Sequence, residues 1–213
     1  MHLVTLGVGA AWSPRYRPAG LLVSHKGVRV IIDGGPDMVP TGHIDAWLLT
    51  DDASELAGAI RAKARARKLV ARVASFRASD LSIDPRPIVH TNHPAFGYEI
   101  RCRALKIVWA PEFFRFPAWA RDADLMFAEA SSWQRPILFR GSVGGHLDAL
   151  SVQRAARRAG VKRLVFAHIG RPTIRAIAAG LRPVFGEFGH DGQGFRPRLR
   201  RKPWTSVSGT HRT

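Results

Sequence analysis

Acidic and histidine side chains recur at the points where short apolar runs of the sequence end. The positions that share this feature are Asp33, Asp51, Asp52, His90, Glu112, Glu129 and His168. Because strands are rigid, polar side chains at the ends of several strands can converge on one point. Carboxylates and imidazoles that converge in this way bind metal ions or orient a water molecule for hydrolysis. One such residue alone is usually a cap or a turn residue, but the whole set predicts a site.

The apolar runs before these residues predict β-strands, because they are rich in Val, Ile, Leu and aromatic residues and are bounded by Gly, Pro or Asp. We expect strands at 3–6, 20–23, 28–32, 46–50, 88–90, 98–101, 106–109, 125–128 and 164–168. We expect helices at 54–68, 147–159 and 172–180. The first helix places Leu56, Ile60 and Ala64 on one apolar face. This order of elements predicts an α/β fold of two packed sheets with helices on the outside.

The composition limits the class of protein. The chain has 213 residues, of which 46% are hydrophobic, so it can bury a core, and wholesale disorder is excluded. Cys102 is the only cysteine, which excludes an intrachain disulfide and fits a reducing compartment. The first residues lack the basic start of a signal peptide, and no apolar run approaches the ~20 residues of a membrane span. We therefore expect a cytoplasmic protein with no membrane partner.

The chain is strongly basic, with 33 Lys and Arg against 16 Asp and Glu and a formal net charge of +17. Much of the excess lies in two stretches without acids, between Arg61 and Arg77 and after Asp191. Such stretches attract polyanions, so the basic helix and the tail predict contact with nucleic acid. An Arg-rich composition on a solvated surface gives the same pattern without any ligand. We expect one domain over 1–190 and a basic, flexible C-terminal tail over 191–213.

Several segments resemble those of one known family in their order and spacing. The segments are Leu-Gly-Val-Gly-Ala-Ala at 6–11, Val-Ile-Ile-Asp-Gly-Gly-Pro at 30–36, Ile-Val-Trp-Ala-Pro-Glu at 107–112, Asp-Leu-Met-Phe-Ala-Glu-Ala at 124–130 and Val-Lys-Arg-Leu-Val-Phe-Ala-His at 161–168. They are similar to the metallo-β-lactamase superfamily, closest to its phosphodiesterase branch, which includes the tRNA 3′-end endonucleases. The resemblance covers about 6–188. It implies an αββα sandwich, in which two mixed β-sheets carry helices on their outer faces.

The resemblance also implies roles for the residues at the strand ends. His90 resembles the isolated histidine ligand of the branch, Glu112 the carboxylate that bridges the metals, and His168 the final histidine ligand. Asp33 and Glu129 resemble acids with a structural role.

The signature motif of the superfamily, His-x-His-x-Asp-His, is altered in this chain. Its four metal-binding positions correspond to Asp51, Ala53, Glu55 and Leu56, and neither Ala53 nor Leu56 can bind metal. The metal ligands that the resemblance then implies are Asp51, Glu55, His90, Glu112 and His168. This set predicts one divalent ion rather than two, and its many oxygen donors suit Mn²⁺ or Mg²⁺ better than Zn²⁺.

Two functions are compatible with these residues. The first is a metal-dependent hydrolase that cleaves a phosphodiester or a related ester, in a small molecule or a nucleic acid, with a metal-activated water. In this hypothesis Glu55 or Asp51 is the base that orients the water, and His146 protonates the leaving group. The alternative is a catalytically inactive member of the fold that binds nucleic acid or another protein.

Simpler interpretations exist for the same side chains. Asp51 or Asp52 can cap the helix that follows, with Glu55 in its first turn. His146 can cap the next helix, and His168 can hydrogen-bond a backbone carbonyl. Three further histidines are expected on the surface: His25, His43 and His93.

Overall fold

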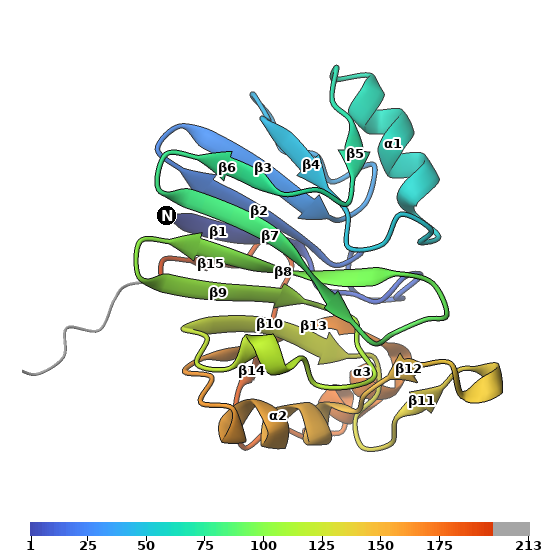
Figure 1. Ribbon diagram of the computed structural model, residues 1–213. Helices are drawn as coiled ribbons and strands as arrows, with labels where there is room; N and C mark the ends of the chain where they lie inside the picture. The colour runs from blue at the N-terminus through green and yellow to red at the C-terminus, as the bar shows by residue number, and fades with distance from the viewer. Residues whose placement is uncertain (198–213) are drawn as a thin grey trace, which may run out of the picture.

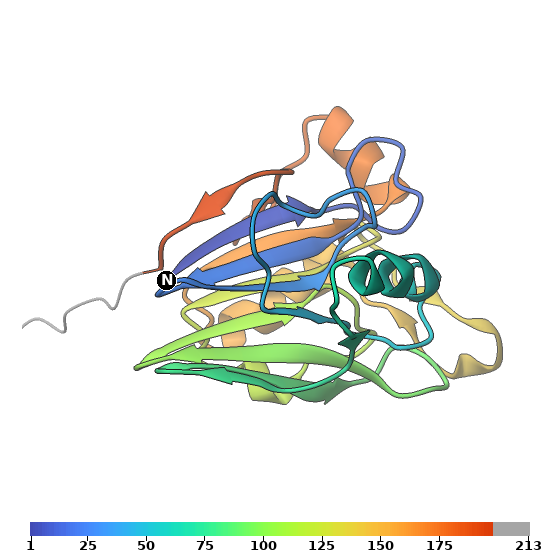
Figure 2. The ribbon, with the colours of Figure 1, turned by 90° about the horizontal axis from the view of Figure 1, so that it is seen from above.

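Two β-sheets pack face to face in the computed structural model, which describes residues 1–197 (Figures 1 and 2). The first sheet has the strand order β15-β1-β2-β3-β4-β5. Its strands are β1 (His2–Gly7), β2 (Gly20–His25), β3 (Val28–Asp33), β4 (Ala46–Leu48), β5 (Ala71–Arg72) and β15 (Gly194–Phe195). Strands β3, β4 and β5 are parallel, so their carboxyl ends lie at the same edge of the sheet.

The second sheet has the strand order β14-β13-β10-β9-β8-β7-β6. Its strands are β6 (Phe76–Ala78), β7 (Leu81–Ile88), β8 (Ala95–Cys102), β9 (Leu105–Ala110), β10 (Leu125–Ala130), β13 (Leu164–Ile169) and β14 (Glu187–Phe188). Strands β9, β10 and β13 are parallel, and the segments that follow them therefore leave the sheet at one edge. A separate hairpin pairs β11 (Ile137–Leu138) with β12 (Gly145–His146).

The main hydrophobic core fills the space between the sheets. It contains Leu3 and Ile32 from the first sheet and Ile107, Phe127 and Phe166 from the second, all fully buried. In β1 buried and partly exposed residues alternate, as expected for a strand with one face on a core.

Helices cover the outer faces of both sheets (Figure 1). The buried face of α1 (Ala57–Arg65) packs on the first sheet, where Ile60 shares a second core cluster with Ile31 and Trp47. Helix α2 (Ala149–Arg158) packs along β10 and β13, and α3 (Arg171–Ala178) follows β13 directly. The two 3₁₀ helices are η1 (Ala118–Ala120) and η2 (Arg140–Ser142). This arrangement confirms the expected αββα sandwich.

The expected run at 88–90 is the element whose boundaries differ most. The strand is β7, which ends at Ile88, so His90 lies in the following loop. Most of this strand was not predicted from the sequence, because it contains Pro85 and Pro87, which are unusual inside strands. They lie where β7 pairs only with β8, because β6 reaches no further than Ile83. Prolines are tolerated at such a free edge, since no partner strand there needs their missing N–H group.

The C-terminal part of the described chain belongs to the first sheet. Strand β15 pairs with β1, and Phe195 is almost completely buried. The carboxylate of Asp191 accepts hydrogen bonds from the backbone N–H groups of Val8 and Arg17. The expected domain boundary at 190 therefore falls inside folded structure, and the remainder of the expected tail, 198–213, lies outside the described residues. Within residues 1–197, no helix has the length and apolar character needed to cross a membrane.

Candidate functional site

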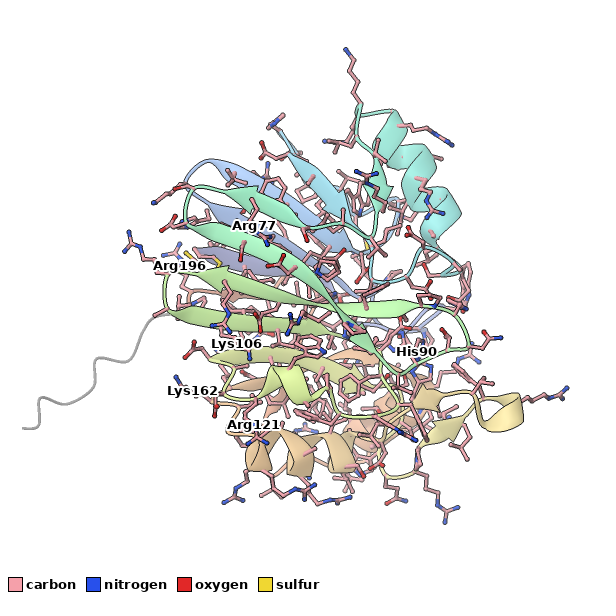
Figure 3. All side chains as sticks on the ribbon, in the orientation of Figure 1. Arg77, His90, Lys106, Arg121, Lys162 and Arg196 are labelled. Carbon is pink, nitrogen blue, oxygen red and sulfur yellow. The ribbon has the colours of Figure 1, made fainter. Side chains whose placement is uncertain are left out.

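A cavity of about 630 Å³ is lined by the β11–β12 hairpin and by the segments that follow β1, β4, β7, β9, β10 and β13. Six of the predicted residues line it: Asp51, Glu55, His90, Glu112, His146 and His168. Figure 3 shows His90 at this end of the molecule, away from Lys106 and Arg196. The fold therefore brings together side chains that are more than 100 residues apart in the sequence.

Glu112, which follows β9, lies between two histidines of this cavity. Its Oε2 is 2.7 Å from Nε2 of His90, and its Oε1 is 3.0 Å from Nε2 of His168. Burial acts to raise the pKa of Glu112, but the charge and hydrogen bonds of His168 and His90 hold it well below its ordinary value. Burial acts to lower the pKa of His168, but Glu112 and Glu129 raise it to about 10. The three groups thus form one ionic network.

Glu129, at the end of β10, supports this network from behind. It is fully buried and accepts hydrogen bonds from the backbone N–H groups of Ser131 and Phe113, at 2.7 and 3.2 Å. Its Oε2 is 2.8 Å from Nδ1 of His146, and its Oε1 is 3.5 Å from Nδ1 of His168. Burial acts to raise the pKa of Glu129, yet the two histidines lower it to about 2. Glu129 therefore stays ionised and fixes the orientation of both rings.

The β11–β12 hairpin holds His90 in place. Nδ1 of His90 lies 3.0 Å from the carbonyl oxygen of Gly145, whose N–H donates to the carbonyl oxygen of His90. A Cβ at Gly144 would lie 2.0 Å from the same His90 carbonyl oxygen, so this approach requires glycine. Phe139 of the hairpin packs its ring edge-on against His90 and His146.

Asp51 is joined in the cavity by a histidine that the sequence reasoning missed. Its Oδ2 is 2.8 Å from Nε2 of His93, and its Oδ1 accepts a hydrogen bond from the backbone N–H of Ala53. The His93 side chain is 37% exposed and lines the cavity, so this surface histidine also belongs to the site, which the sequence analysis did not predict. The available signal was its position, since it lies three residues after His90 in the same loop. Asp51 does not cap α1, whose N-cap position is Leu56.

The remaining predicted residues lie around this centre. Glu55 is exposed at the rim of the cavity. His146 belongs to β12 and does not cap α2, because the carboxylate of Asp148 takes that position and accepts from the N–H of Ser151. Of the other expected surface histidines, His43 is exposed. His25 is not, because its side chain is only 10% exposed.

Asp33 lies outside the main cavity, at the end of β3. Its carboxylate accepts hydrogen bonds from the N–H and hydroxyl of Thr50 and from the indole N–H of Trp109. Burial raises its pKa to about 6 despite these three donors. Its contacts connect β3 to the loop after β4 and to β9, and they hold the two sheets in register beneath the site.

His90, His168 and Glu112 offer donors of the kinds that bind a divalent ion. His90 and His168 both face Glu112 with Nε2. Nδ1 of His90 faces the carbonyl oxygen of Gly145. Nδ1 of His168 faces Ser131 and Glu129. A fixed partner on one ring nitrogen is what orients metal-binding histidines. Two imidazoles and a carboxylate suit Zn²⁺ or Mn²⁺.

Two further observations concern the metal donors of this cavity. The side chains of Ala53 and Leu56, in the loop that follows β4, offer no metal donor. The ligand atoms of Glu129, His146 and His168 also lie within 4.8 Å of one another. However, the oxygens of Glu129 already accept two backbone N–H groups, which is typical of a supporting residue.

Comparison of the structure with solved structures identifies the fold. The metallo-β-lactamase fold protein YhfI from Bacillus subtilis superposes with a TM-score of 0.71 at 16% identity, over 92% of this chain and 99% of that one. Human tRNase Z, short form, gives 0.70 at 14% identity, over 93% and 100%. A diphosphatase from the PhnP family gives 0.66 at 16% identity, over 91% and 96%.

These likenesses establish that the chain has the metallo-β-lactamase fold, as the sequence predicted. No protein-family model and no curated protein sequence matches the chain. At such low identities the likeness establishes the fold alone.

Proposed function

We propose that the protein is a metal-dependent hydrolase that acts on a phosphodiester or a related ester. The observation that carries the proposal is the pair of Nε2 atoms, from His90 and His168, that face the two oxygens of Glu112 in a cavity. The fold is shared with a diphosphatase and with a tRNase Z, which supports a phosphorus-containing substrate.

Three residues would hold the metal in this proposal: His90, His168 and Glu112. A bound divalent ion lowers the pKa of a coordinated water towards neutrality and so supplies a nucleophile. Gly145 and Ser131 keep the two imidazoles oriented, because the Gly145 carbonyl contacts Nδ1 of His90 and Oγ of Ser131 contacts Nδ1 of His168.

Asp51 is the better placed of the two candidate bases. Its carboxylate lines the cavity and is fixed at both oxygens, by the Ala53 N–H and by His93. Glu55 is exposed at the rim, where no comparable support orients it among the described residues. We therefore assign Asp51 to accept the proton of the attacking water and keep Glu55 as the second candidate.

His146 is assigned to protonate the leaving group. Its ring lines the cavity, and the Glu129 carboxylate holds Nδ1 at a distance of 2.8 Å. Arg171, the first residue of α3, also lines the cavity and gives it a positive charge that suits an anionic ester.

The proposal is tested by metal analysis and by hydrolysis of bis-(p-nitrophenyl) phosphate in the presence of Mn²⁺ or Zn²⁺. His168→Ala is expected to lower the metal content by about one ion per chain and to abolish metal-stimulated cleavage. His43→Ala is the matched control, because His43 is an exposed histidine that also faces an aspartate, Asp45. A wild-type protein without metal-stimulated cleavage would overturn the proposal.

A binding module is the second candidate, and α1 favours it. The helix exposes Lys63 and Arg65, and the turn after it exposes Arg67 and Lys68. This function predicts nucleic-acid binding that weakens steeply with salt, in wild type and in His168→Ala alike. Binding that is indifferent to salt would count against it.

A further inference from the structure

A second cluster of metal-binding side chains lies at the opposite end of the sandwich. It consists of His25 at the end of β2, Cys102 at the end of β8, and Asp80 in the turn between β6 and β7. Cys102 pairs with Leu105 at the start of β9, whereas Glu112 follows the end of β9. The cluster is therefore separated from the cavity by roughly 20 Å of strand. In Figure 1 the β8–β9 turn lies at the end opposite the β11–β12 hairpin.

The three donor atoms converge. Nε2 of His25 is 2.7 Å from Oδ1 of Asp80 and 3.6 Å from Sγ of Cys102, and all three atoms lie within 4.8 Å of one another. Cys102 is 4% exposed and the His25 side chain 10% exposed. Tight turns fix the surroundings, since Lys26 and Gly27 after β2 both have positive φ.

This geometry differs from that of a nucleophilic triad. In a triad, the nucleophile and the carboxylate use opposite nitrogens of the imidazole. Here Sγ of Cys102 lies 3.6 Å from Nε2 and 4.0 Å from Nδ1 of His25, and Asp80 also contacts Nε2, so the two residues do not use opposite nitrogens. Sulfur, nitrogen and oxygen donors around one point are instead the ligands of a tetrahedral metal site.

We propose that Cys102, His25 and Asp80 bind a zinc-class divalent ion that links the two sheets. His25 belongs to the first sheet, Cys102 to the second, and Asp80 to the turn that joins β6 and β7 of the second sheet. The thiol of Cys102 binds as the thiolate, so each ion that binds releases one proton to solvent. His25 also lines a surface cavity of about 520 Å³, from which a water molecule can supply the fourth ligand.

Two cations already contact the carboxylate of Asp80 and weaken the site. Lys26 Nζ is 2.9 Å from Oδ1, the oxygen that faces His25, and Arg103 Nε is 3.0 Å from Oδ2. The Lys26 side chain is half exposed, so it can move into solvent and leave Oδ1 to the ion. Because an exposed ion pair of this kind is weak, Lys26→Gln is expected to tighten metal binding about two- to fivefold.

The experiment is a Co²⁺ titration of the full-length protein under reducing conditions. Cys102 is the only cysteine, so a thiolate-to-cobalt charge-transfer band in the near ultraviolet reports this site alone. We expect the band to appear in the wild type, to saturate at one ion per chain and to vanish when Zn²⁺ is added. It should persist in His168→Ala, because the cavity contains no sulfur ligand.

Substitutions at Cys102, His25 and Lys26 test whether these residues form the metal site. Cys102→Ser is expected to lose the band, and His25→Gln to weaken the affinity for Co²⁺ at least tenfold. If either variant fails to fold, the wild-type band and the tighter binding of Lys26→Gln still decide. A wild type without the band, or a Lys26→Gln variant with unchanged affinity, would overturn the proposal while leaving the hydrolase proposal untouched.

Discussion

The two ends of the sandwich hold the same kinds of side chain and neutralise them differently. At the cavity end, Glu112 and Glu129 contact histidines and backbone N–H groups. At the other end, Asp80 contacts His25 together with two permanent cations, Lys26 and Arg103. The negative charges of the cavity carboxylates are therefore balanced only when the histidines are protonated or a metal ion is bound. The negative charge of Asp80 is already balanced by Lys26 and Arg103 without a ligand.

This difference affects stability because the cavity carboxylate Glu129 is more buried than Asp80. A buried charge without a partner is costly, and a partner that can lose its proton makes the balance depend on pH and metal. The pKa of His168 is raised to about 10, so His168 holds a proton at neutral pH in the absence of metal, and Glu112 also raises the pKa of His90. An end built in this way can exchange protons for a cation, which is a property that a catalytic centre needs.

The largest effect is expected for His146→Ala, which tests whether chemistry belongs to the cavity end. Loss of a general acid lowers kcat by about 10²–10⁴-fold when the leaving group needs a proton. The loss should nearly disappear for a p-nitrophenolate leaving group, which departs unprotonated. Steady-state kinetics with an alkyl and a p-nitrophenyl ester of the same phosphate measure this contrast, with His43→Ala as the control. Equal losses for both esters would show that His146 has another role.

The next effect concerns stability and compares Glu129 with Asp80. Glu129→Gln removes a buried charge from two histidines and is expected to cost about 3–5 kcal/mol in urea unfolding at neutral pH. Asp80→Asn is expected to cost less, because two of the three partners of Asp80, Lys26 and Arg103, are exposed to solvent. The pKa of Glu129 is lowered from 4.5 to about 2, so its contribution is full above pH 4.5 and is lost as the pH falls towards 2. The gap between wild type and Glu129→Gln should therefore close over that range, and a constant gap would contradict the argument.

Sequence reasoning reached the fold and most of the cavity, because strands with carboxyl ends at one edge bring their following residues together. His90, Glu112 and His168 were found in this way. His93 and His25 were missed for a different reason. His93 does not follow a buried apolar run, and His25 ends β2 at the opposite end of the sandwich. Each meets its partner through loops or sheet packing, His93 with Asp51 and His25 with Asp80. Contacts of that kind depend on turn geometry, which spacing in a sequence does not encode.

The smallest of these effects is expected for His93→Ala, and it separates the two ends most sharply. His93 fixes Asp51 by a contact of 2.8 Å at the cavity end and has no part in the Cys102 cluster. Residues that orient an active carboxylate typically contribute about 10–100-fold, so kcat/KM should fall by about tenfold while folding is retained. His43→Ala is the matched control, since its aspartate partner lies on the surface. The cobalt band of Cys102 should be unchanged in His93→Ala, and a variant that lost both the band and the activity would show that the two ends are coupled through the sheets.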